Sequence, residues 1–301
     1  MLHGVIPVRK APGMTSHDVV SRLRRLAGQK RVGHTGTLDP DVEGVLPVCL
    51  GQATRIAEYI QQMPKRYLGT LVLGVSTDTQ DASGQLIAQV AKVECSPEEV
   101  DAAFARFTGE IEQVPPMYSA VKVGGRRLYD LAREGKEVER KPRRAIIHSL
   151  VRTGFEEGPH PRVNFDVRCS KGTYIRTLCA DIGDSLGVPA HMSHLTRVES
   201  GPFTLEDSVS LEELEAIAAR GNWEDVMAAP GDTLVHFPAL LLPDEDYDAL
   251  MNGGSVEWEE AFSLLPGGRL LRVYTEDGRF CGLYRQVDER TAHPEKVFRA
   301  W

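Results

Sequence analysis

The sequence predicts an α+β protein with a larger N-terminal domain and a small β-rich module at its C-terminal end. Three patterns support this prediction. Segments that alternate apolar and polar residues are typical of strands with one buried face. Capped segments with helical periodicity lie between them. After about Phe237 the pattern changes to short strands separated by turn residues, which indicates a domain boundary.

The first residues predict a strand followed by a helix. Residues 5–8 form the strand, and the Pro-Gly pair at 12–13 turns the chain toward a helix that begins at Thr15 or Ser16. Thr15 and Asp18 have the spacing of a capping box, which satisfies backbone donors at a helix start. The helix then has one apolar face, with the arginines on the other: Val19, Val20, Leu23 and Leu26 against Arg22, Arg24 and Arg25.

The middle of the chain predicts three strands and two helices. Residues 67–74, 145–152 and 162–169 are strand-like. A helix opens at residues 96–99 (SPEE), with a capping serine, a proline in the first turn and acidic residues near the positive end of the helix dipole. Residues 173–186 form a helix, or a strand that leads into one.

The C-terminal segment predicts a short helix and a hairpin. Proline bounds an acidic helix at residues 243–251. Residues 270–275 and 279–284 are short strands around Asp277 and Gly278, a pair that is typical of hairpin turns.

Composition indicates an ordinary soluble protein. Of 301 residues, 42% are hydrophobic and 26% are charged, which excludes wholesale disorder and disulfide-stapled miniatures. No window approaches the roughly 18 consecutive apolar residues of a membrane helix, and the N-terminus lacks a signal-peptide pattern. We therefore expect a cytoplasmic protein without a membrane partner. The five cysteines contain no C-x-x-C pair and are expected to be reduced, mostly structural thiols.

The charges are unevenly distributed along the chain. The net charge is -8, yet residues 1–70 hold 10 basic against 5 acidic residues, and residues 116–176 hold 14 against 7. Residues 205–301 hold 8 against 20. Two basic stretches are what a cationic groove for phosphates requires, although ordinary solvated faces are an alternative.

Residues 33–48 (GHTGTLDPDVEGVLPV) form the densest functional signal. Glycines, prolines, a histidine and three carboxylates before an apolar run predict a tight loop that holds polar side chains over a core element. A calcium loop is one alternative, but Leu50 stands where that template needs a bidentate glutamate, so we expect no metal site. Nucleotide-cofactor motifs are absent, so we expect no cofactor.

The same loop resembles the catalytic motif of the tRNA pseudouridine synthase B family, whose members isomerise uridine 55 in the T-loop of tRNA. The match comprises GHTGTLDP at 33–40 and its continuation at 44–51. Further matching segments follow in the order that the family shows: 10–16, 65–67 (KRY), 115–122, 127–133, 171–176 (KGTYIR) and 194–197. The resemblance is close over roughly 1–230 and weak in the tail. One departure is Lys10-Ala11-Pro12-Gly13, where the family usually has Lys-Pro-x-Gly, and this concerns the local turn.

The resemblance implies a mixed, mainly antiparallel sheet of pseudouridine-synthase type in a catalytic domain over residues 1–237. It also implies a mobile RNA-gripping insertion at about 116–144, which holds nine Lys and Arg residues and the Gly124-Gly125 pair. Residues 238–301 resemble a small PUA-like RNA-binding module, despite their acidity.

By resemblance, three residues carry the reaction. Asp39 is the essential carboxylate, and it attacks C6 of uracil or C1' of ribose, or the sugar passes through an eliminated intermediate; the sequence leaves these routes open. Arg176 resembles the arginine that pairs with this aspartate and keeps it ionised. Tyr67 resembles the tyrosine that stacks on the target base and takes part in removing the C5 proton.

The resemblance also implies residues that bind the substrate. The base is extruded from the T-loop, and His34 is suited to fill the space that it leaves. The others line the uracil pocket or contact the RNA: Tyr174 and Leu195, and Lys10, Lys122, Arg126 and Arg127.

We therefore expect a stand-alone, cofactor-free isomerase that acts on the T-stem-loop of tRNA as a monomer without an obligate protein partner. One alternative is a non-catalytic RNA-binding or RNA-folding factor on the same scaffold, which the retention of Asp39, Tyr67 and Arg176 disfavours. A second is a metal-dependent hydrolase that uses His34 with Asp39, Asp41 and Glu43, which the failed ligand template disfavours.

Overall fold

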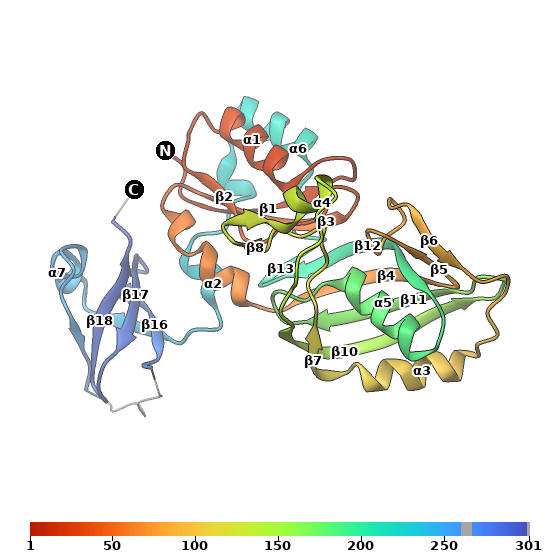
Figure 1. Ribbon diagram of the computed structural model, residues 1–301. Coiled ribbons are helices and arrows are strands. Elements are labelled where there is room, and N and C mark those ends of the chain that lie inside the picture. The colour runs from red at the N-terminus through yellow and green to blue at the C-terminus, as the bar shows by residue number, and fades with distance from the viewer. Residues whose placement is uncertain (260–266, 300–301) are drawn as a thin grey trace. The chain divides into compact units, whose positions relative to one another are not determined.

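A computed structural model describes residues 1–259 and 267–299 of the chain (Figure 1). Its contacts divide the chain into two compact units. The terminal unit comprises Met1–Asp41, Val45–Gln61 and Gly201–Trp301, and the central unit comprises Val42–Gly44 and Gln62–Ser200.

The central unit is built on a mixed, mainly antiparallel sheet. Its strands lie in the order β12 (Ala190–Ser200), β4 (Lys65–Leu73), β11 (Arg162–Cys169), β10 (Arg143–Glu156) and β7 (Gly109–Gln113). Every neighbouring pair in this order is antiparallel. The first residues of β3 (Glu43–Leu50) pair in parallel with Thr196 and Arg197 of β12. The predicted fold class and the three predicted strands of this region are therefore confirmed.

Two helices cover one face of this sheet (Figure 1). They are α3 (Pro97–Arg106), where the predicted capping residue Ser96 forms a capping box with Glu99, and α5 (Ile175–Ser185). The ring of Phe104 on α3 meets Phe165 of β11 edge-on, with 6.4 Å between the centroids. Burial of such apolar faces is the main stabilising term for short helices, which are marginal in isolation.

Two hairpins extend from the central sheet. One is formed by β5 (Val75–Thr77) and β6 (Leu86–Gln89). The other lies in the predicted insertion, where β8 (Lys122–Val123) pairs with β9 (Arg126–Arg127) and α4 (Leu128–Arg133) follows. Gly124 and Gly125 form the turn with φ of 57° and 83°, values that side chains with a Cβ disfavour.

The N-terminal part of the terminal unit opens with the predicted strand and helix. It begins with β1 (Gly4–Lys10), α1 (Ser16–Leu26), β2 (Val32–His34) and the rest of β3, then η1 (Gly51–Arg55) and α2 (Ala57–Gln62). The Thr15 capping box of α1 is present, so the predicted helix start is confirmed. After the central unit the chain forms β13 (Phe203–Thr204), α6 (Leu211–Arg220), η2 (Trp223–Asp225) and η3 (Gly231–Leu234). Helices α1 and α6 lie side by side and are joined by an ion pair between Arg22 and Glu215 (Figure 1).

A five-stranded sheet forms the C-terminal module, which confirms the predicted β-rich ending. The strand order is β14 (Ala239–Leu242), β16 (Leu270–Thr275), β17 (Phe280–Gln286), β18 (Thr291–Val297) and β15 (Val256–Glu257). The predicted hairpin around Gly278 joins β16 to β17. The predicted helix at 243–251 is shorter: a turn at η4 (Asp244–Asp246) precedes α7 (Tyr247–Met251), because only the second half has apolar residues that pack on the module's core.

This module docks on the segment that follows β3 in the terminal unit. The Tyr59 hydroxyl donates to Oε1 of Glu295 at 3.0 Å, and Lys296 pairs with Glu58 at 3.0 Å. The guanidinium of Arg55 lies over the Phe298 ring, 5.6 Å from its centroid. Throughout residues 1–259 and 267–299, no helix has the length and apolar character that crossing a membrane requires.

Candidate active site

Asp39 lies in the loop between β2 and β3, and hydrogen bonds fix this loop on both sides of it. On one side, the Ser16 hydroxyl accepts from the Leu38 N–H at 2.9 Å and donates to the Leu38 carbonyl at 3.2 Å. On the other side, the Pro40 carbonyl accepts from the Gly13 N–H at 3.0 Å. Asp39 itself is partly buried. The predicted tight loop is therefore fixed by hydrogen bonds, and the groups that fix it belong to α1 and to the turn before it.

Lys10 is a further anchor of the same loop. Its ammonium donates to the carbonyl of Pro40 at 2.8 Å and to that of Ala11 at 3.0 Å, and its side chain is buried. These bonds make Lys10 an anchor of the loop that carries Asp39, and its predicted contact with the substrate stays a prediction.

His34 ends β2 and stays partly exposed. Its Nδ1 accepts a hydrogen bond from the Gly36 N–H at 3.2 Å, which orients the ring. In the neutral ring this bond leaves the proton on Nε2, which makes the outer edge of the imidazole a donor.

Tyr67 and Leu195 share one face of the central sheet. In the pairing of β4 with β12, Tyr67 lies opposite Arg197 and Gly69 lies opposite Leu195. A Cβ on Gly69 would lie 2.4 Å from the Phe165 ring and 3.0 Å from the Leu195 side chain, so glycine is required for these two side chains to meet beside Tyr67. The two residues that the sequence predicts for base stacking and the uracil pocket are therefore neighbours on adjacent strands.

Two buried cations lie on the same face, and no role was predicted for either. Arg197, opposite Tyr67, is 1% exposed. Lys65 donates to the Met63 carbonyl at 2.6 Å. Burial, and then the positive charge of Arg197, lowers the pKa of Lys65 to about 8. Both residues lie in segments that match the family, KRY and HLxR. The sequence therefore indicates these residues, but it does not indicate that they are buried.

Arg176 is held at the start of α5 by segments far away in the sequence. Its guanidinium donates to the Thr79 carbonyl at 2.9 Å and to the Tyr118 carbonyl at 2.8 Å. Its Nε lies 3.7 Å from Oδ2 of Asp81. The side chain is 6% exposed. The sequence analysis did not identify Asp81. The signal that could have indicated it is the segment 77–84, which is rich in turn-forming polar residues.

The predicted site residues are divided between the two units. Asp39, His34 and Lys10 belong to the terminal unit, where the loop anchors bring Lys10 to the segment of Asp39. The central unit holds the others: Tyr67, Tyr174, Arg176, Leu195, Lys122, Arg126 and Arg127. The pairing of Asp39 with Arg176 stays a prediction.

Three basic residues of the insertion, Lys122, Arg126 and Arg127, are exposed on the β8–β9 hairpin. Arg126 forms an ion pair with Glu134, and this bond lowers the pKa of the Glu134 carboxyl to about 2. Arg127 donates to the Tyr129 hydroxyl at 2.7 Å and lies over its ring, 5.6 Å from the centroid. Lys122 lies opposite Arg127 in the hairpin. The hairpin therefore presents a cationic surface with an aromatic ring, an arrangement suited to nucleic acid.

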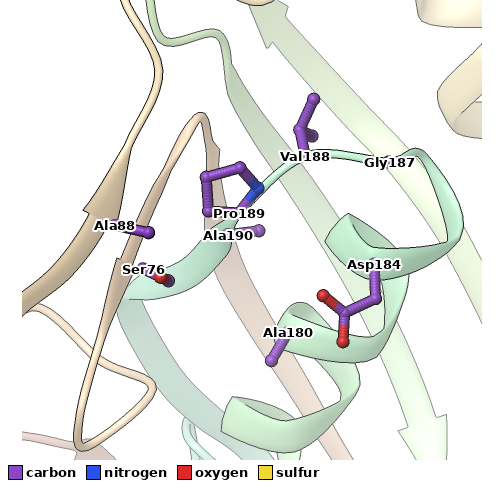
Figure 2. A pocket seen from close by; sticks show the side chains of 8 residues that line it. All are labelled: Ser76, Ala88, Ala180, Asp184, Gly187, Val188, Pro189 and Ala190. Carbon is purple, nitrogen blue, oxygen red and sulfur yellow. The ribbon is translucent and has the colours of Figure 1, made fainter.

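A pocket of about 390 Å³ lies at the other end of α5 (Figure 2). It is lined by Ser76 and Ala88 of the β5–β6 hairpin, by Ala180 and Asp184 of α5, and by residues 187–190. None of the predicted site residues lines it. The pocket therefore does not mark the predicted active site.

In the described parts of the chain, no group of three or more His, Cys, Asp or Glu side chains has the arrangement of a metal site. The cysteines are free thiols, and four of the five are buried. Burial raises the pKa of the Cys49 thiol to about 12 and that of Cys169 to about 11. Thiols with raised pKa values are poor nucleophiles, which fits the predicted structural role.

Comparison with known families agrees with this fold. The family model described as "TruB family pseudouridylate synthase (N terminal domain)" matches residues 24–175. The model described as "tRNA pseudouridylate synthase B C-terminal domain" matches residues 176–243. The fold and these matches define the class, which is that of the pseudouridine synthases. Within that class, the chain belongs to the TruB family.

Individual relatives and solved structures cover most or nearly all of the chain. A tRNA pseudouridine synthase B of Geobacillus thermodenitrificans is 46% identical over 99% of this chain and 100% of its own length. One of Symbiobacterium thermophilum is 56% identical over 72% of this chain and 73% of its own. The crystal structure of a Cbf5-Nop10-Gar1 complex contains a chain with a TM-score of 0.75 and 27% identity, covering 99% of this chain and 85% of that one.

Proposed function

We propose that this protein isomerises uridine to pseudouridine in tRNA, at position 55 of the T-loop, with Asp39 as the nucleophile and without a cofactor. The observation that carries the proposal is the GHTGTLDP loop, anchored on both sides of Asp39, in a chain of the TruB family. Relatives that match this chain over almost its full length carry the name tRNA pseudouridine synthase B.

The reaction breaks the C1'–N1 glycosidic bond and forms a C1'–C5 bond, and the proton at C5 moves to solvent while N1 gains one. No atom is added or lost, so a residue that attacks and is later released is sufficient. The Asp39 carboxylate serves as this group in its ionised form. Attack on C6, attack on C1' and elimination all conserve atoms and electrons.

The other two catalytic residues have separate tasks. Arg176 supplies positive charge beside the reacting carboxylate, and the carbonyls of Thr79 and Tyr118 fix where that charge lies. Tyr67 offers a ring face for stacking and a hydroxyl that takes part in removing the C5 proton. Leu195, two positions away on the neighbouring strand, forms an apolar wall of the uracil pocket.

The RNA is bound mainly through its phosphates. Lys122, Arg126 and Arg127 contact the T-stem-loop from the exposed β8–β9 hairpin, and His34 occupies the space that the flipped base leaves. The C-terminal module, residues 238–301, adds PUA-like contacts. The protein works in the cytoplasm as a monomer and needs no protein partner.

The test is incubation of the purified protein with unmodified tRNA transcript in EDTA, without nucleotide, followed by mapping of pseudouridine. We expect a single pseudouridine at position 55 and none in a transcript with cytidine there. Tight binding without conversion would support the RNA-folding alternative instead. Conversion that depends on added metal would contradict the cofactor-free mechanism.

A further inference from the structure

The side chain of Gln113 forms hydrogen bonds with the backbone of Tyr174 through both of its polar groups. Its Oε1 accepts from the Tyr174 N–H at 3.0 Å, and its Nε2 donates to the Tyr174 carbonyl at 3.1 Å. Gln113 is the last residue of β7, and it is 2% exposed. Both residues belong to the central unit. The Gln113 side chain therefore gives the backbone of Tyr174, which lies outside the sheet, the two hydrogen bonds that a neighbouring strand would give.

Tyr174 is the N-cap residue, immediately before α5. It has an extended backbone, with φ of -98° and ψ of 105°, and it makes no side-chain cap. Its carbonyl also accepts the first helical bond, from the Leu178 N–H at 2.9 Å. Arg176 follows two residues later. Fixing the peptide groups of Tyr174 therefore fixes the direction in which the chain enters the helix that carries Arg176.

Gln113 also lies at the base of the insertion. In the sheet it pairs with Arg143, so these two residues are where the chain leaves β7 and enters β10. The Arg176 guanidinium donates to the Tyr118 carbonyl, five residues beyond Gln113. Two separate contacts thus join the base of the insertion to the segment from Tyr174 to Arg176.

We propose that Gln113 is a positioning residue for the isomerisation, which fixes Tyr174 and Arg176 at the base of the RNA-gripping insertion. This inference rests on the proposed function. A displacement of about 1 Å at a reacting group lowers turnover by about 100-fold. Affinity for the RNA comes mainly from phosphate contacts elsewhere on the protein. Loss of the Gln113 contacts should therefore lower kcat and leave KM nearly unchanged.

Two variants test the proposal. Gln113→Glu keeps the shape of the side chain and its acceptor for the Tyr174 N–H. In its ionised form it replaces the donor with an oxygen that faces the Tyr174 carbonyl, and because burial favours the neutral carboxyl, which still donates, its kcat is measured as a function of pH up to 9. Gln113→Leu removes both hydrogen bonds. We expect kcat for a T-stem-loop RNA to fall by about 10- to 100-fold in both, with KM within about threefold of wild type.

The chain contains a matched control. Gln29, 8% exposed, holds Leu2 in the same way: Oε1 accepts from the Leu2 N–H at 2.9 Å and Nε2 donates to the Leu2 carbonyl at 3.1 Å. Gln29→Leu therefore removes an equivalent pair of bonds, together with a longer bond of 3.4 Å from Nε2 to the Arg31 carbonyl, at a residue with no predicted role in the site. We expect it to lower the melting temperature as Gln113→Leu does, with kcat within about twofold of wild type.

The outcomes distinguish a failure of the proposed function from a failure of the positioning role of Gln113. A wild-type protein that forms no pseudouridine would overturn the proposed function. An active wild type with Gln113→Glu and Gln113→Leu matching Gln29→Leu in kcat would overturn the positioning role, as would a rise in KM with unchanged kcat. Should Gln113→Leu not fold, Gln113→Glu decides the question, since it keeps one of the two bonds.

Discussion

The hydroxyl of Ser16 and the backbone of Leu38 exchange two hydrogen bonds, at 2.9 and 3.2 Å, across 22 residues of sequence. Ser16 is the first residue of α1, and its side chain is almost completely buried. Leu38 immediately precedes Asp39. The helix that follows the first strand therefore fixes the backbone beside the predicted nucleophile, and its own position is fixed by the Thr15 capping box.

Ser16→Ala should weaken both the fold and the reaction. The change leaves the Leu38 N–H without its partner, and a buried unsatisfied donor costs about 1–3 kcal/mol of unfolding free energy. Because the loop beside Asp39 loses an anchor, we expect kcat to fall by about 10-fold. Urea unfolding and turnover of tRNA measure the two effects. Ser208→Ala, which removes a buried hydroxyl that donates to the Leu205 carbonyl, is the control and should alter stability alone.

The sequence predicted elements whose signals are local. The α1 start follows from the spacing of Thr15 and Asp18, and the hairpin after β16 follows from Asp277 and Gly278, because each signal lies within a few residues of the structure that it specifies. The acidic helix at 243–251 was overestimated because a proline and acidic residues indicate a helix start without saying what it packs against.

The contacts that position the site leave no such local signal. Arg176 meets the Thr79 carbonyl across 97 residues, and Gln113 meets Tyr174 across 61. Hydrophobic periodicity carries no information about which distant backbone group a buried polar side chain will reach. The resemblance supplied the names of the catalytic residues, but their supporting contacts, and the burial of Lys10, required the fold.

Asp39→Asn should abolish pseudouridine formation and leave RNA binding near that of wild type. The amide retains the shape of the side chain but is a poor nucleophile, while the predicted phosphate contacts are elsewhere. A tritium-release assay and a filter-binding assay measure the two quantities. Asp41→Asn is the control, because Asp41 lies exposed in the same loop and should retain activity. Product from the Asp39→Asn variant would refute the nucleophile assignment.

Arg176→Lys should lower kcat by about 100-fold, since one ammonium does not reproduce a planar guanidinium that reaches several acceptors at once. The acceptors are the carbonyls of Thr79 and Tyr118, with Asp81 beside the Nε. Arg106→Lys is the control, because exposed Arg106 donates to the Ser185 carbonyl at the opposite end of α5. Equal kcat values for the two variants would remove Arg176 from the catalytic group.

Replacing Lys122, Arg126 and Arg127 with glutamine should weaken RNA binding and flatten its salt dependence. Each lost phosphate contact reduces the log-log slope by about 0.7 to 0.9. Arg126 is paired with Glu134, so Glu134→Gln should release it and strengthen binding at low salt. Lys92→Gln, at an exposed lysine in the segment before α3, is the control for charge alone. A slope that is unchanged in the triple variant would exclude the insertion from phosphate contact.

The stability of the fold should depend on pH through Asp181, on α5. Burial, and then the charge of Asp184, raises the pKa of Asp181 from 3.8 to about 6. A carboxyl with a raised folded-state pKa favours its neutral form, so its contribution to stability is complete below pH 3.8 and is lost as the pH rises through 6. The neutral isostere in Asp181→Asn avoids this loss.

We therefore expect Asp181→Asn to gain stability relative to wild type between pH 4 and pH 7, by about 1–2 kcal/mol after allowance for its partial exposure. Urea unfolding of both proteins across this range measures the gain. Asp184→Asn should lower the pKa of Asp181, and with it the pH at which stability is lost. This change should be smaller than the contribution of burial, because burial is the larger cause of the raised pKa. A difference between Asp181→Asn and wild type that stays constant with pH would show that this carboxyl titrates at its ordinary value in the folded protein.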